Sequence, residues 1–359
     1  MSSNRLANLR NLLREEGLDW MLIESAANRR YLSRFTGSAG TLLISQEQAF
    51  LATDFRYYQQ VEQQAPAFTL VRLKREEKEG LALFLHQNVA EGSRLAFEAE
   101  HLTVARHESL KSAVDKVEWV PTRGLVERLR AVKDEEELTA IRRAVALADE
   151  ALMATMPTLR PAMTEREVAW RLETYMRERG ASKVSFDIIV GSGPNGAKPH
   201  ATVSDRALAA GEPIVIDMGC VVEGYCSDLT RTLVLGQPDG RFRELHSLVL
   251  QAQEAAERGM RAGMTGREAD ALARQVITAA GHAEEFGHSL GHGVGLEIHE
   301  LPLVGHQGED PLVQGMVCTV EPGVYLPDWG GIRIEDMVVV REDDVEVLTA
   351  CTKDPVIPL

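Results

Sequence analysis

Residues 214–228 read Ile-Val-Ile-Asp-Met-Gly-Cys-Val-Val-Glu-Gly-Tyr-Cys-Ser-Asp, which places acidic side chains in segments that otherwise read as buried strand. Asp217 follows β-branched residues, and Asp228 lies beyond a turn signal at residues 222–224. If the loop consists of residues 222 and 223, Asp217 and Asp228 are directly opposed across a hairpin, with Cβ atoms about 5 Å apart. Like charges at that spacing destabilise a hairpin unless a cation lies between them. The stretch therefore predicts a hairpin whose paired acids face one side.

A second pair of acids repeats this arrangement nearer the C-terminus. Glu321 lies in Thr-Val-Glu-Pro-Gly and Glu335 in Ile-Arg-Ile-Glu-Asp, and the residue midway between them, Asp328, falls in a loop rich in turn residues. A buried carboxylate is costly unless it is neutralised, hydrogen-bonded or bound to a metal. One such acid is usually structural, but four in two predicted hairpins favour a functional site.

Histidines supply the remaining candidate ligand. The segment 286–300 reads FGHSLGHGVGLEIHE, and five of the ten histidines fall between 282 and 306. His288 and His292 have the spacing of helical zinc ligands, but the intervening and following glycines make a helix implausible. We expect these glycines to let the backbone approach a ligand closely. Four carboxylates and one imidazole suit two divalent ions, between which a water molecule acquires a lowered pKa and becomes a nucleophile. The pattern therefore predicts hydrolysis.

A glycine motif at residues 191–196, Gly-Ser-Gly-Pro-Asn-Gly, superficially matches a dinucleotide-binding fingerprint after the apolar run 188–190. That fingerprint requires a helix to begin at the loop, so that the helix N-terminus faces the pyrophosphate. Pro194 and Pro199 interrupt this segment, and no helical period follows. We expect a glycine-rich turn.

The chain divides into two predicted domains. The first 125 residues alternate helix and strand signals, with an apolar stripe from Leu6 to Leu13 and strands at 20–23, 41–44 and 50–53, as in an α/β domain. The second domain, 126–359, opens with a capping box at Asp134 and Glu137 and mixes helices with hairpins. It is predicted to be α+β, with further helices at 164–179, 245–260 and 266–280.

Composition excludes several classes. The chain has 359 residues and a net charge of −15, which disfavours nucleic acid as a partner. No apolar stretch approaches the roughly 18 residues of a membrane helix, and the N-terminal residues carry no apolar signal segment. With four cysteines in this length, we expect a reduced cytoplasmic protein without a disulfide framework. Cys220 and Cys226 flank the first acidic hairpin, and we expect buried inert thiols there, with a thiolate ligand as the alternative.

The ordered set Asp217, Asp228, His292, Glu321 and Glu335 closely resembles the ligands of the pita-bread dinuclear metallopeptidases. The supporting strings are IDMG, YCSDLTRT, HSLGHGVGLEIHE, TVEPGVY and GIRIED. The first domain resembles the creatinase-type N-terminal domain of the Xaa-Pro peptidases. This resemblance implies an α/β creatinase-like domain before an α+β pita-bread catalytic domain. It also implies two divalent ions bound by those five residues, with Mn²⁺ expected and Zn²⁺ or Co²⁺ as alternatives, and a homodimer.

The resemblance also implies roles for other residues. Glu321 would additionally serve as general base, and His299 would hydrogen-bond the scissile carbonyl. His288 would line a proline pocket and Arg333 would orient the acids. His200 would contact the substrate, which makes the glycine-rich turn before it a substrate loop.

The substrate would be a peptide with proline at its second position, and two specificities stay open. Asp54-Phe55-Arg56-Tyr57 resembles the Asp-x-Arg-Tyr motif of small bacterial aminopeptidases P, so we expect that activity, with Arg56 and Tyr57 at the substrate. An ion pair between Arg56 and Asp54 is the structural alternative. A prolidase, which cleaves Xaa-Pro dipeptides, is the alternative activity, with Arg29, Arg30 or Arg34 as a carboxylate clamp. A hydrolase of amidino or methionyl substrates is less favoured, and a non-catalytic pita-bread binding protein would require a broken metal set.

Overall fold

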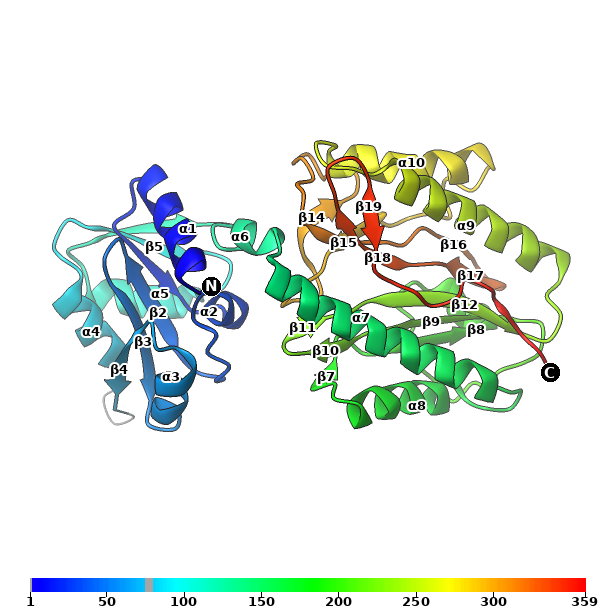
Figure 1. The fold of residues 1–359 in the computed structure, drawn as a ribbon, viewed down its shortest axis with the longest axis horizontal. Coiled ribbons are helices and arrows are strands. Elements are labelled where there is room, and N and C mark those ends of the chain that lie inside the picture. Colours follow the sequence, from blue (N-terminus) through cyan, green and yellow to red (C-terminus); the bar gives the residue numbers. More distant parts are fainter. Residues whose placement is uncertain (1, 75–79) are drawn as a thin grey trace. The chain divides into compact units, whose positions relative to one another are not determined.

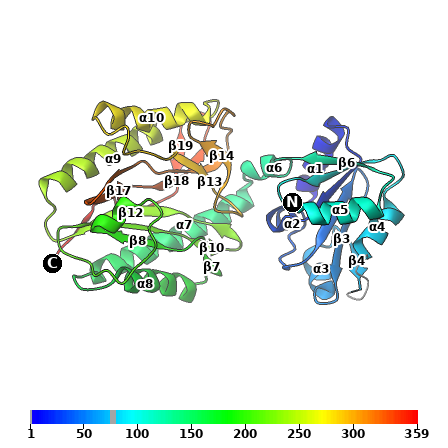
Figure 2. The same ribbon diagram turned by 180° about the vertical axis from the view of Figure 1, so that it is seen from behind.

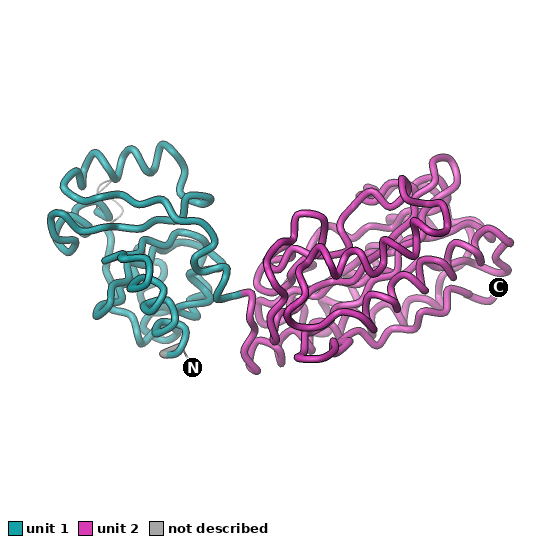
Figure 3. Tube along the Cα trace, turned by 90° about the horizontal axis from the view of Figure 1, so that it is seen from above, with its two compact units in different colours: residues 1–130 teal, residues 131–359 magenta. Residues whose placement is uncertain are grey.

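The computed structural model describes residues 2–74 and 80–359, which form two compact units, 1–130 and 131–359 (Figure 3). The boundary predicted from the sequence lies at about residue 125. Among the described residues, no helix combines the length and the apolarity that a membrane crossing needs.

The first unit is an α/β domain built on one six-stranded sheet (Figure 1). Its strand order is β4-β3-β2-β1-β5-β6, with antiparallel pairs at β1–β2 and β2–β3 and parallel pairs elsewhere. The helices are α1 (Ser2–Glu15), α2 (Ala26–Ser33), α3 (Tyr58–Gln64), α4 (Gly80–Asn88), α5 (Val104–Ala113) and α6 (Glu127–Ala131), which ends at the boundary. The strands are β1 (Trp20–Ile23), β2 (Thr41–Ser45), β3 (Ala49–Asp54), β4 (Thr69–Leu73), β5 (Arg94–Glu98) and β6 (Glu118–Thr122).

The second unit is α+β, with two pairs of helices on opposite sides of layered sheets (Figures 1 and 2). Its helices are α7 (Glu135–Thr155), α8 (Glu165–Glu178), α9 (Gly240–Gly259) and α10 (Gly266–Ala279). Its strands are β7 (Lys183–Val184), β8 (Ile189–Ser192), β9 (Pro213–Met218), β10 (Cys220–Val222), β11 (Tyr225–Cys226), β12 (Leu229–Leu235), β13 (Gly291–Gly293), β14 (Glu300–Val304), β15 (Val317–Val320), β16 (Gly323–Leu326), β17 (Gly330–Arg333), β18 (Asp336–Val340), β19 (Val345–Val347) and β20 (Val356–Ile357).

Each helix pair covers its own sheet. Helices α7 and α8 bury Leu152 and Leu172 against β9 and β12, in a sheet of order β20-β12-β9-β8. Helices α9 and α10 bury Val249 and Ala273 against a second sheet of order β14-β13-β15-β18-β19. The acids of the site therefore lie between two apolar layers.

Local sequence determines where several helices begin. The capping box predicted at Asp134 and Glu137 is present at the start of α7, because each side chain accepts the other's backbone N–H. Helices α8 and α10 begin with the same device, at Thr164 and Thr265. These caps satisfy backbone N–H groups that have no partner inside the helix.

The register of the first acidic hairpin differs from the prediction. Strands β9 and β12 pair Asp217 with Thr230, and Val222 pairs with Tyr225 farther out. The turn residues are Glu223 and Gly224, with φ of 52° and 90°, a primed turn that matches strand twist. The direct opposition of Asp217 and Asp228 was therefore wrong by two residues. A shift of two residues keeps a side chain on the same face, so both acids still point to one side.

The second acidic hairpin has the predicted centre. It pairs Val320 with Asp336 and Gly323 with Arg333, so that Glu321 and Glu335 lie at equal distances from Asp328. Asp328 itself has a φ of 64° and forms part of the connecting turn.

Candidate metal centre and catalytic cavity

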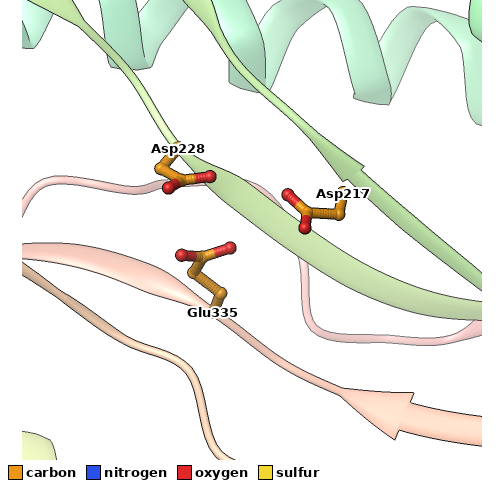
Figure 4. A group of neighbouring side chains, drawn as sticks. All are labelled: Asp217, Asp228 and Glu335. Carbon is orange, nitrogen blue, oxygen red and sulfur yellow. The ribbon is translucent and has the colours of Figure 1, made fainter. Parts of the chain in front are cut away.

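Three carboxylates from three separate segments converge in the second unit. Asp217 lies on β9, Asp228 precedes β12, and Glu335 lies between β17 and β18. One oxygen from each lies within 4.8 Å of the others, and the carboxylates point toward one another (Figure 4). Asp228 is 5 % exposed and Glu335 is 1 % exposed. The hairpin acids that the sequence singled out are thus brought to one buried point.

Two oxygens of this acidic cluster (Asp217, Asp228 and Glu335) accept hydrogen bonds from described side chains, and three other oxygens are buried without such a donor. Asp217 Oδ2 accepts from the Arg333 guanidinium at 2.6 Å, and Glu335 Oε2 accepts from the Thr230 hydroxyl at 2.7 Å. Among the described residues, nothing donates to Oδ1 of Asp217, Oδ1 of Asp228 or Oε1 of Glu335, although all three are buried. Burial, followed by repulsion from neighbouring acids, raises the pKa of Asp228 and of Glu335. Such a set of bare carboxylate oxygens fits a divalent cation.

His292 and Glu321 lie beside this cluster. The Nδ1 atom of His292 is 3.1 Å from the Gly293 carbonyl, which can only accept, so Nδ1 carries the proton. The unprotonated Nε2 then faces Glu321 Oε1 at 3.4 Å and Asp228 Oδ2 at 3.6 Å. Because Nε2 and both carboxylate oxygens are hydrogen-bond acceptors, a cation between them would stabilise this arrangement. The bond from Nδ1 to the Gly293 carbonyl leaves Nε2 unprotonated, as a metal ligand must be. Thr319 supports both residues, because its hydroxyl donates to Glu321 at 3.0 Å and accepts the His292 backbone N–H at 3.1 Å.

A chain of hydrogen bonds joins Arg333 to His288. Arg333 donates to the Tyr325 hydroxyl at 2.7 Å and to the Thr230 hydroxyl at 3.1 Å. The Tyr325 hydroxyl lies 3.1 Å from His288 Nε2, while His288 Nδ1 donates to the Ser289 carbonyl at 2.8 Å. Burial raises the pKa of Tyr325 to about 12 and lowers that of His288. Tyr325 therefore donates to a neutral His288.

A cavity of about 800 Å³ in the second unit opens onto the acids. His299 reaches it from the segment after β13, with its ring centroid 4.2 Å from that of His292 and the ring planes at 70°. Burial lowers the pKa of His299, which keeps the imidazole neutral. The apolar residues that line the cavity include Trp170, Phe186, Ile188, Val203 and Leu303. All five predicted ligands line the cavity, together with His200, His288, His299 and Arg333.

The segment 192–204 presents His200 to this cavity and is built around the carboxylate of Glu165. Glu165 is the first residue of α8 and is fully buried. It accepts from the Ser192 N–H at 2.8 Å, from the Asn195 amide at 3.1 Å, and from the Ser204 N–H at 3.1 Å and hydroxyl at 2.6 Å. The glycine motif leads into a short 3₁₀ helix, Gly193–Ala197, rather than an α-helix, which excludes a dinucleotide site.

Farther from the cavity, buried charges hold the strands that carry the ligands. Arg231 donates to Asp336 at 2.8 Å and to the backbone carbonyls of Thr230 and Cys351 at 3.0 and 2.7 Å. Asp336 also pairs with Lys353 at 2.7 Å. Arg231 and Asp336 both lie within the sequence motifs given above, but their roles were not predicted from the sequence. The supporting hydroxyls of Thr230, Thr319 and Tyr325 were also missed, and their positions beside the acids in those motifs were the available signal.

The glycines beside the histidines and the four cysteines are both closely packed within the protein. The glycines of segment 291–295 do not make room for a ligand. A Cβ atom at Gly291 would collide with the Thr319 carbonyl, at Gly293 with the Leu301 carbonyl, and at Gly295 with the Glu300 carboxylate. The backbone does make close approaches at these glycines, but to other parts of the protein and not to a ligand as predicted. The four cysteines are buried and free, and burial raises the pKa of Cys220 and of Cys226 to about 11.

The remaining candidate residues, Arg56 and Tyr57, belong to the first unit. Arg56 donates through Nε and Nη2 to Asp54 at 2.8 and 2.7 Å, the ion pair that was the structural alternative. The Tyr57 hydroxyl lies 2.6 Å from that of Ser38, and its ring meets Phe35 edge to face. A substrate-binding role for either residue stays a prediction.

Comparison with known proteins identifies the family of the chain. Residues 139–342 match the model of metallopeptidase family M24, and residues 5–132 match the creatinase/prolidase N-terminal domain. An Xaa-Pro dipeptidase of Pyrococcus furiosus is 34 % identical over 98 % of this chain and 99 % of that protein. A solved Xaa-Pro dipeptidase from Bacillus anthracis is 40 % identical, with a TM-score of 0.96 over 100 % of both chains. A solved X-Pro aminopeptidase from Thermotoga maritima is 37 % identical, with a TM-score of 0.90 over 97 % of this chain and 100 % of that one. The chain belongs to metallopeptidase family M24, in its Xaa-Pro peptidase branch, with a creatinase-type N-terminal domain and a pita-bread catalytic domain.

Proposed function

We propose that this protein is an Xaa-Pro dipeptidase that hydrolyses the bond between an N-terminal residue and a C-terminal proline. The observation that carries the proposal is the convergence of Asp217, Asp228 and Glu335 beside the unprotonated Nε2 of His292, where each acid has a buried oxygen to which no described residue donates. The aminopeptidase P activity expected from the sequence is less well supported, because the relatives named above include dipeptidases that cover nearly the whole chain at 34 % and 40 % identity.

We assign two divalent ions, Mn²⁺ first, to a ligand set of Asp217, Asp228, His292, Glu321 and Glu335. Ions held there would supply a water molecule of lowered pKa as nucleophile and would stabilise developing negative charge. Each residue has a geometric reason for its place. Each acid of the cluster has a buried oxygen to which no described residue donates, His292 has the required tautomer, and the Thr319 hydroxyl donates to Glu321.

The chain's own groups perform the proton transfers and orient the substrate. Glu321 takes the proton of the attacking water and delivers it to the leaving proline nitrogen. Neutral His299 donates a hydrogen bond to the scissile carbonyl oxygen, where charge accumulates in the transition state. His288, held by Tyr325, borders the proline ring, and His200 contacts the residue before it.

One observation favours the aminopeptidase alternative. Among the described residues that line the cavity, the arginines are Arg166 and Arg333. Arg333 is bound to Asp217 and Tyr325, and Arg166 forms an ion pair with Asp205 at 2.8 Å. A dipeptidase is expected to hold the substrate carboxylate with a cation, and either arginine would first have to leave its present partner. The Thermotoga maritima relative, titled an X-Pro aminopeptidase, keeps this alternative in view.

Initial rates on an Xaa-Pro dipeptide and on the matching Xaa-Pro-Xaa tripeptide test the proposal, after chelation and readdition of Mn²⁺. Faster dipeptide cleavage is expected, and faster tripeptide cleavage would establish the aminopeptidase instead. A Glu321→Gln variant should lose about 10²–10⁴-fold in kcat, since it loses its general base. Metal-independent cleavage, or none of either peptide, would refute both activities.

A further inference from the structure

Lys133 and Glu300 form an ion pair that no step above uses. The Lys133 Nζ atom lies 2.9 Å from Glu300 Oε1, and the two side chains are 0 % and 4 % exposed. Lys133 lies just before the N-cap of α7, and Glu300 begins β14 directly after His299. Neither residue lines the cavity. A buried ion pair is weak evidence for a role in stability, because an apolar pair of similar volume is often as stable.

The Glu300 carboxylate closes the segment 293–300, which connects His292 to His299. Within it, the Glu297 N–H donates to Glu300 Oε2 at 3.4 Å and the Gly295 N–H donates to the Glu297 carbonyl at 3.0 Å. Gly295 has no space for a side chain because the Glu300 carboxylate occupies it. The Gly295 carbonyl in turn accepts the Cys226 N–H at 2.8 Å. One oxygen of Glu300 therefore holds the segment, and the other meets Lys133.

Lys133 is itself fixed to the strand that leads to Glu321. Its backbone N–H donates to the Gly315 carbonyl at 3.0 Å, and the neighbouring Val132 forms a β-bridge with Met316. Gly315 and Met316 immediately precede β15, which ends one residue before Glu321. The ion pair thus links the segment of His299 to the strand of Glu321 by a short path through buried groups.

We propose that Lys133 and Glu300 are positioning residues that set the His299 imidazole relative to Glu321 and His292. This inference rests on the proposed role of His299. If the pair is lost, the backbone of segment 293–300 becomes more mobile. His299 is then no longer held at hydrogen-bond distance from the scissile carbonyl oxygen. Misplacement by about 1 Å is enough to cost roughly 10²-fold in rate.

A set of variants separates positioning from stability. Lys133→Met leaves the Glu300 carboxylate buried without its cation, so both Tm and kcat should fall. The double variant Lys133→Met/Glu300→Met replaces the pair by apolar groups and should recover Tm and bind as much Mn²⁺ per chain as wild type. Its kcat should nevertheless stay about 10–100-fold low with KM within about twofold, and amide exchange in 293–300 should be faster than in wild type. Glu300→Asp, which keeps the charge but shortens the side chain, should also lower kcat.

Asp149→Asn is the matched control. Asp149 lies on α7, outside the segment 293–300, is 3 % exposed and accepts the Ala350 N–H at 2.7 Å. This variant should lose Tm and keep kcat. A double variant with wild-type kcat and wild-type amide exchange would overturn the inference. If wild type itself cleaves no Xaa-Pro peptide, the proposed function fails, and with it the role given to the pair. If wild type is active and the double variant has the same kcat and the same amide exchange, only the positioning role is refuted.

Discussion

The Arg333 guanidinium lies 2.6 Å from Oδ2 of Asp217, so this carboxylate of the acidic cluster already carries a cation, whereas Glu335 receives a neutral hydroxyl. Arg333 also reaches Tyr325, Thr230 and the Pro199 carbonyl. It therefore joins one proposed metal ligand, the residue that holds His288, and the segment that presents His200. A single planar guanidinium group therefore hydrogen-bonds both to a proposed metal ligand and to the groups that hold the proposed substrate-binding histidines.

Replacement of Arg333 by lysine should lower kcat by about 10–100-fold, because one ammonium group cannot reach Asp217, Tyr325 and Thr230 together. Steady-state kinetics on an Xaa-Pro dipeptide with saturating Mn²⁺ measures the effect. Tyr325→Phe removes only the hydroxyl and should cost less. Equal activity of Arg333→Lys and wild type would show that charge alone suffices at this position.

The acidic cluster should make the metal-free protein less stable than a variant with fewer charges. Asp228→Asn removes one of the mutually repelling buried carboxylates, so in chelator it should unfold at a higher temperature than wild type. On addition of Mn²⁺, wild type should gain about 2.7 kcal/mol at 100 times the Kd, and Asp228→Asn should gain far less. Thermal unfolding with and without Mn²⁺ checks both halves. A variant destabilised in chelator would contradict the proposed repulsion.

Stability should depend on pH through His246 on α9. This histidine is 8 % exposed and its ring stacks on Phe242, and burial lowers its pKa to about 4. The unfolded chain binds the proton first, so the free energy of unfolding falls as pH drops from about 6.5 toward 4, by up to about 3 kcal/mol. His246→Phe should flatten urea-unfolding free energies across that window. Identical slopes in the two proteins would exclude this contribution.

Loss of the Glu165 carboxylate should act on substrate binding. Glu165→Gln places an amide N–H₂ among N–H donors, so the segment 192–204 loses its anchor and His200 its position, at a cost of about 1–3 kcal/mol in stability. We expect a larger rise in KM than fall in kcat. Glu167→Gln, which disturbs only the exposed capping box of the same helix, serves as control and should leave KM unchanged. Equal KM values for Glu165→Gln and Glu167→Gln would argue against the role of Glu165 as the anchor of segment 192–204.

The sequence predicted the elements and the convergence of the acids, and the reason is periodicity. An acid in a β-branched run marks a buried strand face, and a register error of two residues left Asp217 and Asp228 on the same side. The turn was misplaced by one residue, because Val222-Glu223 and Glu223-Gly224 can both be taken as the two-residue loop between the strands. Gly224 at the second position was the better signal.

Groups that support the ligands from a distance were not predictable. Lys133 and Glu300 meet only because the fold brings the start of β14 next to the start of α7, and neither residue lies in a pattern with a period. The partners of the motif glycines were hidden for the same reason, since a sequence does not say which backbone lies opposite. Local rules determine caps and turns, whereas these contacts depend on tertiary packing.

The glycine motif that imitates a nucleotide-binding loop does bind an anion, and the anion belongs to the protein. Backbone and hydroxyl donors that would face a phosphate in another fold surround the carboxylate of Glu165 instead. These donors are therefore already bonded to Glu165 when the chain has folded. A glycine-rich motif can therefore indicate correctly that an anion is bound, while the anion is an acidic side chain of the protein and not a cofactor.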